Sequence, residues 1–152
     1  MLKPAAPNIR RALPADVPAL KSCMDAAYAK YTSRISDLPS VSEGIEEDIQ
    51  NHQVWVVIED NNLIAGLILV AGEEYIKVVN LAVHSDHGGK GIGHKLMQHS
   101  ENEARRQDYN EMRLNTHIAM PENVELYKYW GWQETARNEN TVSMKKLLDT
   151  AD

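Results

Sequence analysis

The chain has 152 residues, of which 43% are hydrophobic and 25% are charged, enough apolar material for one domain with its own core. No apolar run is long enough to cross a membrane, the first twenty or so residues lack the apolar centre of a signal peptide, and a net charge of −6 without a basic stripe disfavours nucleic-acid binding. Cys23 is the only cysteine, so no disulfide can form within the chain, and we expect a reduced, cytoplasmic protein.

Strand and helix patterns alternate along the first half of the chain. Residues 9–13 have a strand pattern, and the turn that follows at 14–16 places Asp16 as the cap of a helix. The pattern then predicts a helix over 17–31, a loop over 36–42, a short acidic helix over 43–50, strands over 54–58 and 63–70 joined as a hairpin, and a strand over 75–83.

The second half begins with a longer helical period. Apolar and small residues recur on one face of a helix expected over 91–107, namely Ile92, Leu96, Ser100 and Ala104. The elements expected after it are a strand over 112–116, a helix over 122–130, and strands over 132–136 and 142–144. A meander of strands, a strand–loop–helix–strand crossover and a closing hairpin together predict an α/β (α+β) fold, a mixed sheet with helices on its faces.

Four glycines are gathered in the segment DHGGKGIGHKL, residues 86–96, between a predicted strand and a predicted helix. Glycines allow the main chain to approach a ligand closely, and Lys90 adds a positive charge. The N-terminus of a helix also presents backbone N–H groups and the positive end of the helix dipole. This arrangement is typical of phosphate binding, and we interpret the loop as a pyrophosphate site rather than as a mobile surface turn.

Two other phosphate-binding motifs fit the segment less well. A Walker A loop ends in Gly-Lys-Ser/Thr, whereas this chain has Gly93-His94-Lys95. The dinucleotide-binding fingerprint needs a leading strand–loop–helix unit with an acidic residue about twenty positions later. Asp108 and Glu111 lie near that distance, but the unit stands in the middle of the chain after a meander, which disfavours this motif.

The segment LAVHSDHGGKGIGHKLMQHSENEA resembles the acetyl-CoA-binding motif of the GNAT superfamily N-acetyltransferases, Gln/Arg-x-x-Gly-x-Gly/Ala, with Gly91 and Gly93 as the two small residues. The later segment MPENVELYKYWGW is similar to a helix of the same family that ends in Tyr-x-x-x-Gly before an aromatic residue. Its matching residues are Tyr127, Gly131 and Trp132. Both motifs are correctly spaced, which makes the resemblance specific.

The resemblance extends along nearly the whole chain, because the order of predicted elements agrees with the family from residue 9 to residue 144. It implies that residues 1–152 form a single GNAT domain with a mostly antiparallel twisted sheet of about six to seven strands and about four flanking helices. It also implies an N-acetyltransferase that moves an acetyl group from acetyl-CoA to a primary amine by direct attack in a ternary complex, without a metal.

In the family, the strand before the loop binds the pantetheine arm of acetyl-CoA through its main chain. The resemblance therefore assigns this role to Leu81, Ala82 and Val83, with one N–H able to polarise the thioester carbonyl. It assigns the pyrophosphate to the loop residues Gly88, Gly89, Lys90, Gly91, Ile92, Gly93 and His94. One departure is that Gly88 stands where the family has Gln or Arg, and we expect weaker cofactor binding more than lost function.

The departing thiolate needs a proton, and Tyr127 matches the family's usual donor. Asn123 lies four residues earlier on the same helical face, where it can contact the pantetheine or orient Tyr127. The pattern alone favours Tyr127 as a core aromatic residue, and it is the match to the motif that favours the catalytic role.

The base that deprotonates the amine is left open by the sequence. Glu73, Glu74, His84 and His117 all lie near predicted strand ends, and a water chain is an alternative to any of them.

The acceptor is shaped in this fold mainly by residues 24–50. Polar and aromatic residues there are Tyr28, Tyr31, Arg34, Glu43, Glu46 and Glu47. The acidic group would attract an amine, but it is also typical of a solvated helix face. Small amines, amino acids, antibiotics and protein N-termini all remain as acceptors, and the family also allows a homodimer that no residue of this chain indicates.

Two other functions compete with acetyl transfer. A cluster of potential metal ligands, His84, Asp86, His87 and His94, would suit a zinc hydrolase, but the other histidines show no recognisable ligand spacing, so we expect no metal. The fold would also serve as a catalytically weak acyl-CoA-binding module or sensor, an alternative to which Gly88 gives weight.

Overall fold

The structure is a computed structural model that describes residues 7–32, 35–36 and 43–149. The elements of these residues, in chain order, are β1 (Asn8–Arg11), η1 (Pro14–Asp16, a 3-10 turn), α1 (Val17–Thr32), α2 (Ile45–Asn51), β2 (Gln53–Glu59), β3 (Asn62–Ala71), β4 (Ile76–Val83), η2 (Ser85–His87, a 3-10 turn), α3 (Ile92–Arg106), β5 (Glu111–His117), α4 (Pro121–Tyr129), β6 (Gln133–Arg137) and β7 (Thr141–Leu147).

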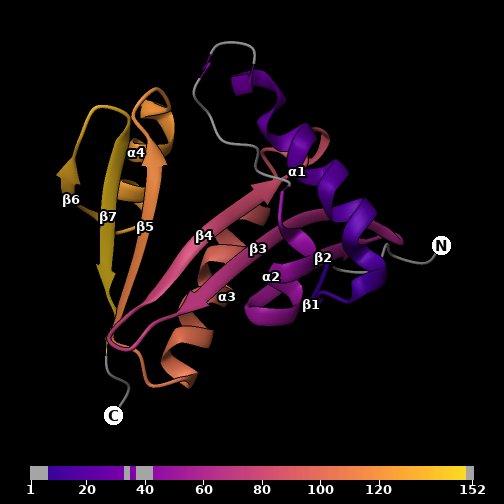
Figure 1. Ribbon diagram of the computed structural model, residues 1–152, viewed down its shortest axis with the longest axis horizontal. Helices are drawn as coiled ribbons and strands as arrows, with labels where there is room; N and C mark the ends of the chain where they lie inside the picture. Colours follow the sequence, from indigo (N-terminus) through magenta and orange to yellow (C-terminus); the bar gives the residue numbers. More distant parts are fainter. Residues whose placement is uncertain (1–6, 33–34, 37–42, 150–152) are drawn as a thin grey trace. The chain divides into compact units, whose positions relative to one another are not determined.

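The described strands form one seven-stranded sheet in the order β1-β2-β3-β4-β5-β7-β6 (Figure 1). Most neighbours are antiparallel, and β4 and β5 are parallel through Ile76–Val78 and Met112–Leu114. Four α-helices accompany the sheet in this part of the chain, so the predicted mixed, mostly antiparallel architecture is confirmed. Each expected helix and strand ends within three residues of its predicted bounds, while Arg34 and residues 37–42 of the expected loop lie outside the described residues.

The chain divides into two compact units, and each is described by itself. The first contains residues 1–69 and 80–98, and the second contains residues 70–79 and 99–152. Three elements, β3, β4 and α3, have residues in both units. No helix in the described part of the chain is long and apolar enough to cross a membrane.

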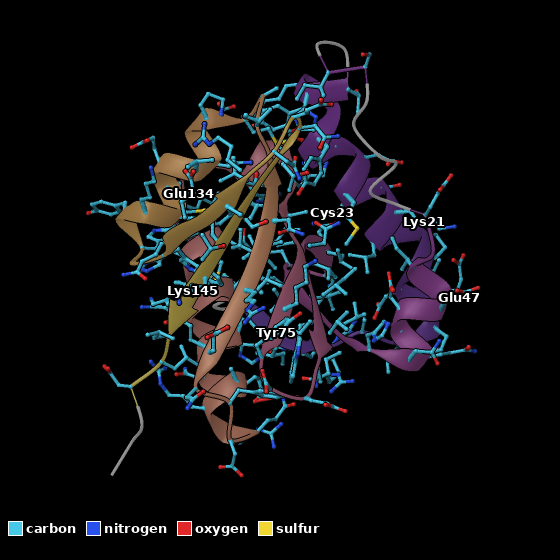
Figure 2. All side chains as sticks on the ribbon, turned by 60° about the vertical axis from the view of Figure 1, so that its left-hand side comes forward. Lys21, Cys23, Glu47, Tyr75, Glu134 and Lys145 are labelled. Atoms are coloured by element: carbon cyan, nitrogen blue, oxygen red, sulfur yellow. The ribbon has the colours of Figure 1, made fainter. Side chains whose placement is uncertain are left out.

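In the first unit, α1 and α2 pack on the strands through one apolar cluster (Figure 1). Its fully buried members come from both helices and from three strands: Leu20, Met24, Ile45, Val54, Val56, Ile68 and Ala82. Gly66 of β3 allows α1 to come this close, because a Cβ atom there would lie 2.5 Å from Leu20 Cδ1. Figure 2 shows Cys23 on the same helix; its thiol is buried, and burial raises its pKa to about 11.

The sequence predicts Asp16 as a helix cap, but in the structure it is the last residue of η1 and its carboxylate reaches backward instead of bonding to α1. Its Oδ2 accepts a hydrogen bond from the Leu13 N–H (2.7 Å), and both carboxylate oxygens bind the Arg10 guanidinium at 2.7 and 3.0 Å. Leu13, rather than Asp16, is therefore the residue that begins the turn. The Arg10 hydrogen bond lowers the pKa of Asp16 below its usual value of 3.8.

In the second unit, β5, β7 and β6 form an antiparallel ladder against which α4 packs. Side chains of one face of β5 and β7 are buried, as are Val124 of α4 and Trp132 after it, whereas every residue of β6 is exposed. Lys146 of β7 forms an ion pair with the largely buried Glu101 of α3 (2.9 Å) and donates to the Trp130 carbonyl (2.8 Å). The Lys146 ammonium thus connects β7 with α3 and with the residue that ends α4.

We expect Asp16→Ala to lower the free energy of unfolding by about 1 kcal/mol at pH 7, because it removes the hydrogen bond to the Leu13 N–H and the Arg10 pair. Since folding lowers the pKa of Asp16, this stabilisation is complete above the unfolded-state pKa and is lost as the pH falls through the folded-state value. Urea unfolding of both proteins at pH 7 and at pH 3 measures the difference. A difference that grows toward low pH would contradict this account.

Candidate cofactor site

The predicted phosphate loop lies in the first unit, between the end of β4 and the start of α3. The His84 N–H donates to the Ile64 carbonyl (2.8 Å), and the His87 N–H donates to the His84 carbonyl (2.8 Å). The His84 ring accepts a hydrogen bond from the Asp86 N–H through Nδ1 (3.1 Å). These contacts give the segment His-Ser-Asp-His a structural role in the turn. Among the described residues, no three His, Cys, Asp or Glu side chains are grouped so that they could hold a metal ion.

Two glycines of the loop are required by the backbone. Gly89 and Gly91 have φ angles of +80° and +78°, a region that residues with side chains rarely adopt. Gly88 differs, because its φ is −64° and a Cβ atom there would meet only the Ser85 carbonyl oxygen, at an ordinary 3.7 Å. The position at which the family carries Gln or Arg therefore has room for a side chain in this fold.

The start of α3 presents main-chain donors beside these glycines. The Lys95 N–H donates to the Gly91 carbonyl (3.1 Å), so the helix begins directly after the loop. The Ile92 side chain is 4% exposed and anchors the first turn, whereas residues 88–91 are exposed. The first N–H groups of an α-helix have no acceptor within the helix and lie at the positive end of its dipole. An exposed loop of this kind is suited to an anion.

A carboxylate that the sequence analysis missed accompanies the loop. Glu59, the last residue of β2, lies with Oε1 at 3.4 Å from Lys90 Nζ and at 3.9 Å from His87 Nδ1. Lys90 Nζ also lies 3.0 Å from His87 Nδ1. The side chain that we expected to supply free positive charge is thus shared with an acid from 31 positions earlier, and no local pattern signals this contact.

Leu81, Ala82 and Val83, the predicted pantetheine strand, end β4 in the same unit. The Ala82 side chain belongs to the buried cluster beneath α1, which fixes this part of the main chain. Just before it, the Asn80 amide oxygen accepts a 3.4 Å hydrogen bond from the hydroxyl of Tyr28. Burial raises the pKa of Tyr28, so its hydroxyl stays protonated at neutral pH.

The candidate acceptor residues differ in their surroundings. The rings of Tyr28 and Tyr31 lie close together on α1, with centroids 6.2 Å apart. Glu46 is paired with Lys21 at 2.9 Å, while Glu43 and Glu47 are exposed. The structure therefore brings Tyr28 to the predicted pantetheine strand and leaves the acidic residues on the surface of the first unit.

Asn123 and Tyr127 lie together on α4 in the second unit. The Tyr127 ring is half-buried, with its centroid 5.9 Å from Trp130 and 6.3 Å from Trp132. Gly131, with a φ of +97°, ends the helix, and the Trp132 N–H then returns to the Tyr127 carbonyl (2.9 Å). The Tyr-x-x-x-Gly spacing thus has a physical cause, a left-handed helix end that also positions the tyrosine's backbone.

The predicted base candidates occupy turns. His117 Nδ1 accepts from the Ala119 N–H (3.0 Å), much as His84 bonds to Asp86. Glu73 and Glu74 are exposed in the turn before β4. In both histidines Nδ1 is thus engaged by a local main-chain N–H.

A strand–glycine loop–helix unit in a mixed seven-stranded sheet is the arrangement of an acetyltransferase domain. The family model described as "Acetyltransferase (GNAT) domain" matches residues 20–147, and the chain belongs to this family. No curated protein matches the sequence.

Several solved structures share the fold. One is the PaiA N-acetyltransferase from Thermoplasma acidophilum in complex with coenzyme A, which is 17% identical, with a TM-score of 0.82 and coverage of 94% of this chain and 99% of that one. Another is the ribosomal-protein-S18-alanine N-acetyltransferase from Escherichia coli (16%, TM-score 0.80, 97% of each chain). A third is a GNAT family acetyltransferase from Elizabethkingia anophelis with acetyl-CoA bound (15%, TM-score 0.69, 93% and 98%).

We expect Gly91→Ala to lower the free energy of unfolding by about 1 kcal/mol, because alanine is strained at a positive φ. The matched control is Gly88→Ala, whose backbone angle suits any residue and whose Cβ has space. Urea unfolding of the two variants measures the difference. Equal losses would show that the two positions do not differ in this way.

Proposed function

We propose that this chain is an N-acetyltransferase that transfers an acetyl group from acetyl-CoA to a primary amine, with residues 1–152 as one GNAT domain. Membership of the family supports the acetyl donor. The observation that carries the proposal is the exposed turn into α3, where positive φ angles at Gly89 and Gly91 present main-chain N–H groups at a helix start. The lone buried Cys23 is compatible with the reducing cytoplasm, where we place the protein.

The diphosphate of acetyl-CoA would bind the main chain of residues 88–94, and the pantetheine arm would bind Leu81, Ala82 and Val83. The ladder between β4 and β5 covers Ile76–Val78, which supports a role for the last residues of β4 in pairing with an extended ligand. The Ala82 side chain is packed in the core of the first unit, which would hold the main chain of this segment in place before the ligand arrives. A preorganised N–H at the thioester carbonyl stabilises the charge that develops on its oxygen.

The reaction forms a bond between the amine nitrogen and the acetyl carbon and breaks the bond between that carbon and sulfur. In this proposal Tyr127 donates its hydroxyl proton to the departing thiolate, and the proton lost by the amine leaves through a base or a water. Asn123, one turn earlier on α4, would hold the pantetheine or the tyrosine. Holding the amine and the thioester together supplies much of the rate enhancement.

For the acceptor we propose a cationic primary amine that approaches the first unit near Tyr28. The hydroxyl of Tyr28 is already engaged with Asn80, next to the proposed pantetheine strand, which favours this side of the unit. The exposed carboxylates Glu43 and Glu47 would attract a positive charge in a chain of net charge −6. Protein N-termini remain among the candidates, because one protein of the same fold is named for acetylating an alanine.

The acyl-CoA-binding module without turnover is the second candidate, and two observations favour it. Gly88 lacks the side chain that the family uses at this position, and Lys90 is partly neutralised by Glu59. Both features would weaken the hold on acetyl-CoA and so favour a catalytically weak protein. Because either candidate binds acetyl-CoA, turnover rather than binding separates them.

Acetyl-CoA at about a hundred times its Kd should stabilise the protein by about 2.7 kcal/mol, measured as a rise in Tm.

Tyr127→Phe should lower kcat by about a hundredfold while Kd for acetyl-CoA changes little, because only the proton donor is lost. Thiol release followed with an aromatic disulfide reports coenzyme A, since the Cys23 thiol is buried.

The control for this variant is Tyr129→Phe on the same helix, at a side chain that is 86% exposed. It removes the same hydroxyl and should leave kcat unchanged. No rise in Tm with acetyl-CoA would overturn the cofactor site. Equal losses of kcat and binding in Tyr127→Phe would make the residue one of packing or binding, and binding without turnover in the wild type would favour the module.

Glu59→Gln should bind acetyl-CoA about fivefold more tightly, because it releases Lys90 and removes a negative charge beside the diphosphate. Asp60→Asn is the control, since it makes the same change of charge one residue later, at an exposed side chain that forms no ion pair with the described residues. Gly88→Arg should change affinity in the same direction as Glu59→Gln. Titrations at two salt concentrations should show that the gain shrinks as salt rises. An unchanged or weaker affinity in Glu59→Gln would contradict the placement of the diphosphate.

A further inference from the structure

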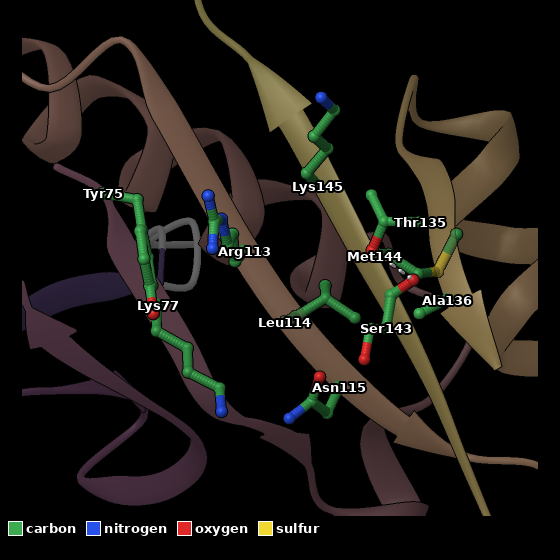
Figure 3. A pocket seen from close by; sticks show the side chains of 10 residues that line it. All are labelled: Tyr75, Lys77, Arg113, Leu114, Asn115, Thr135, Ala136, Ser143, Met144 and Lys145. Atoms are coloured by element: carbon green, nitrogen blue, oxygen red, sulfur yellow. Dashed lines mark hydrogen bonds between the residues drawn. The ribbon is translucent and has the colours of Figure 1, made fainter. Parts of the chain in front are cut away.

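A groove on the second unit is lined by none of the residues assigned to acetyl transfer. It has a volume of about 500 Å³, and its polar lining includes Tyr75, Lys77, Arg113, Asn115, Ser143 and Lys145 (Figure 3). These residues lie on or beside β4, β5 and β7, whereas Asn123 and Tyr127 lie on α4. The volume is in the range of pockets that bind small molecules.

Three cations form a row across neighbouring strands in this groove. Lys77 is the partner of Arg113 in the ladder between β4 and β5, and Arg113 is the partner of Lys145 in the ladder between β5 and β7. Figure 3 shows the three side chains on the three strands. Like charges at directly opposed positions repel each other, so the row is unfavourable unless negative charge is nearby.

Among the described residues of the unit, carboxylates neutralise only the middle cation. Arg113 Nε pairs with Glu111, and its guanidinium lies over the Tyr75 ring, 3.9 Å from the centroid. Neither Lys77 nor Lys145 forms an ion pair with a carboxylate of the described residues, Glu73 and Glu74 in the preceding turn included. Two positive charges of the row thus remain for a ligand.

The neutral groups of the groove are held in place by their own hydrogen bonds. With its oxygen turned toward Lys77, the Asn115 amide accepts from Lys77 Nζ (3.0 Å) and donates to Ser143 Oγ (3.0 Å). Thr135 Oγ1 donates to the Ser143 carbonyl (3.2 Å). Arg113 is held in place by its stacking on the Tyr75 ring. The donors of the groove are therefore arranged before any ligand binds.

We propose that this groove binds a small molecule that carries at least two anionic groups, carboxylates or phosphates, between Lys77, Arg113 and Lys145. The guanidinium would take one group in a forked contact, and the lysines would act as point charges toward the others. Neighbouring strands are about 4.8 Å apart, so the row spans roughly 10 Å, which suits a compact di- or trianion. The site is independent of acetyl transfer, and its test does not use turnover.

The test is a titration of the isotope-labelled full-length protein, followed by NMR, with citrate in one series and inorganic pyrophosphate in another, both at constant ionic strength. We expect saturable shifts of the amide signals of Lys77, of residues 113–115 and of residues 143–145. The anion with the lower Kd identifies the ligand as a polycarboxylate or a polyphosphate. Amide signals of residues 88–94 report separately on the proposed cofactor loop.

Lys145→Gln should raise the Kd of the tighter anion about tenfold, while Lys21→Gln, the same change of charge on α1, should leave it unchanged. Without an anion and at low salt, Lys145→Gln should melt no lower than the wild type, because it removes like-charge repulsion, so lost binding is not unfolding. Shifts confined to residues 88–94, shifts that sodium chloride reproduces, or equal Kd values for the two variants would overturn the proposal.

Discussion

The turn from β4 into α3 depends on backbone conformations at Gly89 and Gly91 that side chains disfavour. Residues 84–91 separate β4 from α3, and the helix begins directly after Gly91, with Ile92 buried and residues 88–91 exposed. The end of β4 is held in turn by Ala82 in the apolar cluster and by the His84 bond to β3. The candidate cofactor site is therefore a consequence of where two glycines allow the main chain to turn.

The side chains of this loop supply little net positive charge to attract a diphosphate. Its one lysine is shared with Glu59, and Gly88 contributes no side chain, so main-chain dipoles are left as the principal anion donors. Such donors are fixed by the fold and are less sensitive to salt than an exposed ion pair. The Glu59 carboxylate also lowers the expected affinity for a diphosphate, because the Lys90 ammonium already has a partner when no ligand is bound.

In the groove of the second unit, charged side chains rather than main-chain N–H groups would attract an anion. There the positive charge comes from side chains at directly opposed strand positions, and stacking on Tyr75 and the bond to Glu111 hold only Arg113. Binding at such a row falls steeply with salt, whereas binding at the helix start depends more on geometry. A chain of net charge −6 would thus have two kinds of anion site, the proposed cofactor loop in the first unit and the proposed groove in the second.

The sequence by itself determined the elements, because periodicity, turn residues and glycine placement act over short stretches of chain. The Tyr127–Gly131 spacing and the glycine loop could be recognised from the sequence for the same reason. Each reflects backbone conformations at one end of a helix that glycine adopts most easily. Tertiary structure alone decided which distant groups meet: Glu59 with Lys90, Tyr28 with Asn80, and Lys77 with Arg113 and Lys145. Asp16, predicted to cap a helix, instead bonds backward to Leu13 and pairs with Arg10 of β1. Strand register and long-range ion pairs depend on how separate segments pack, and no local pattern carries that information.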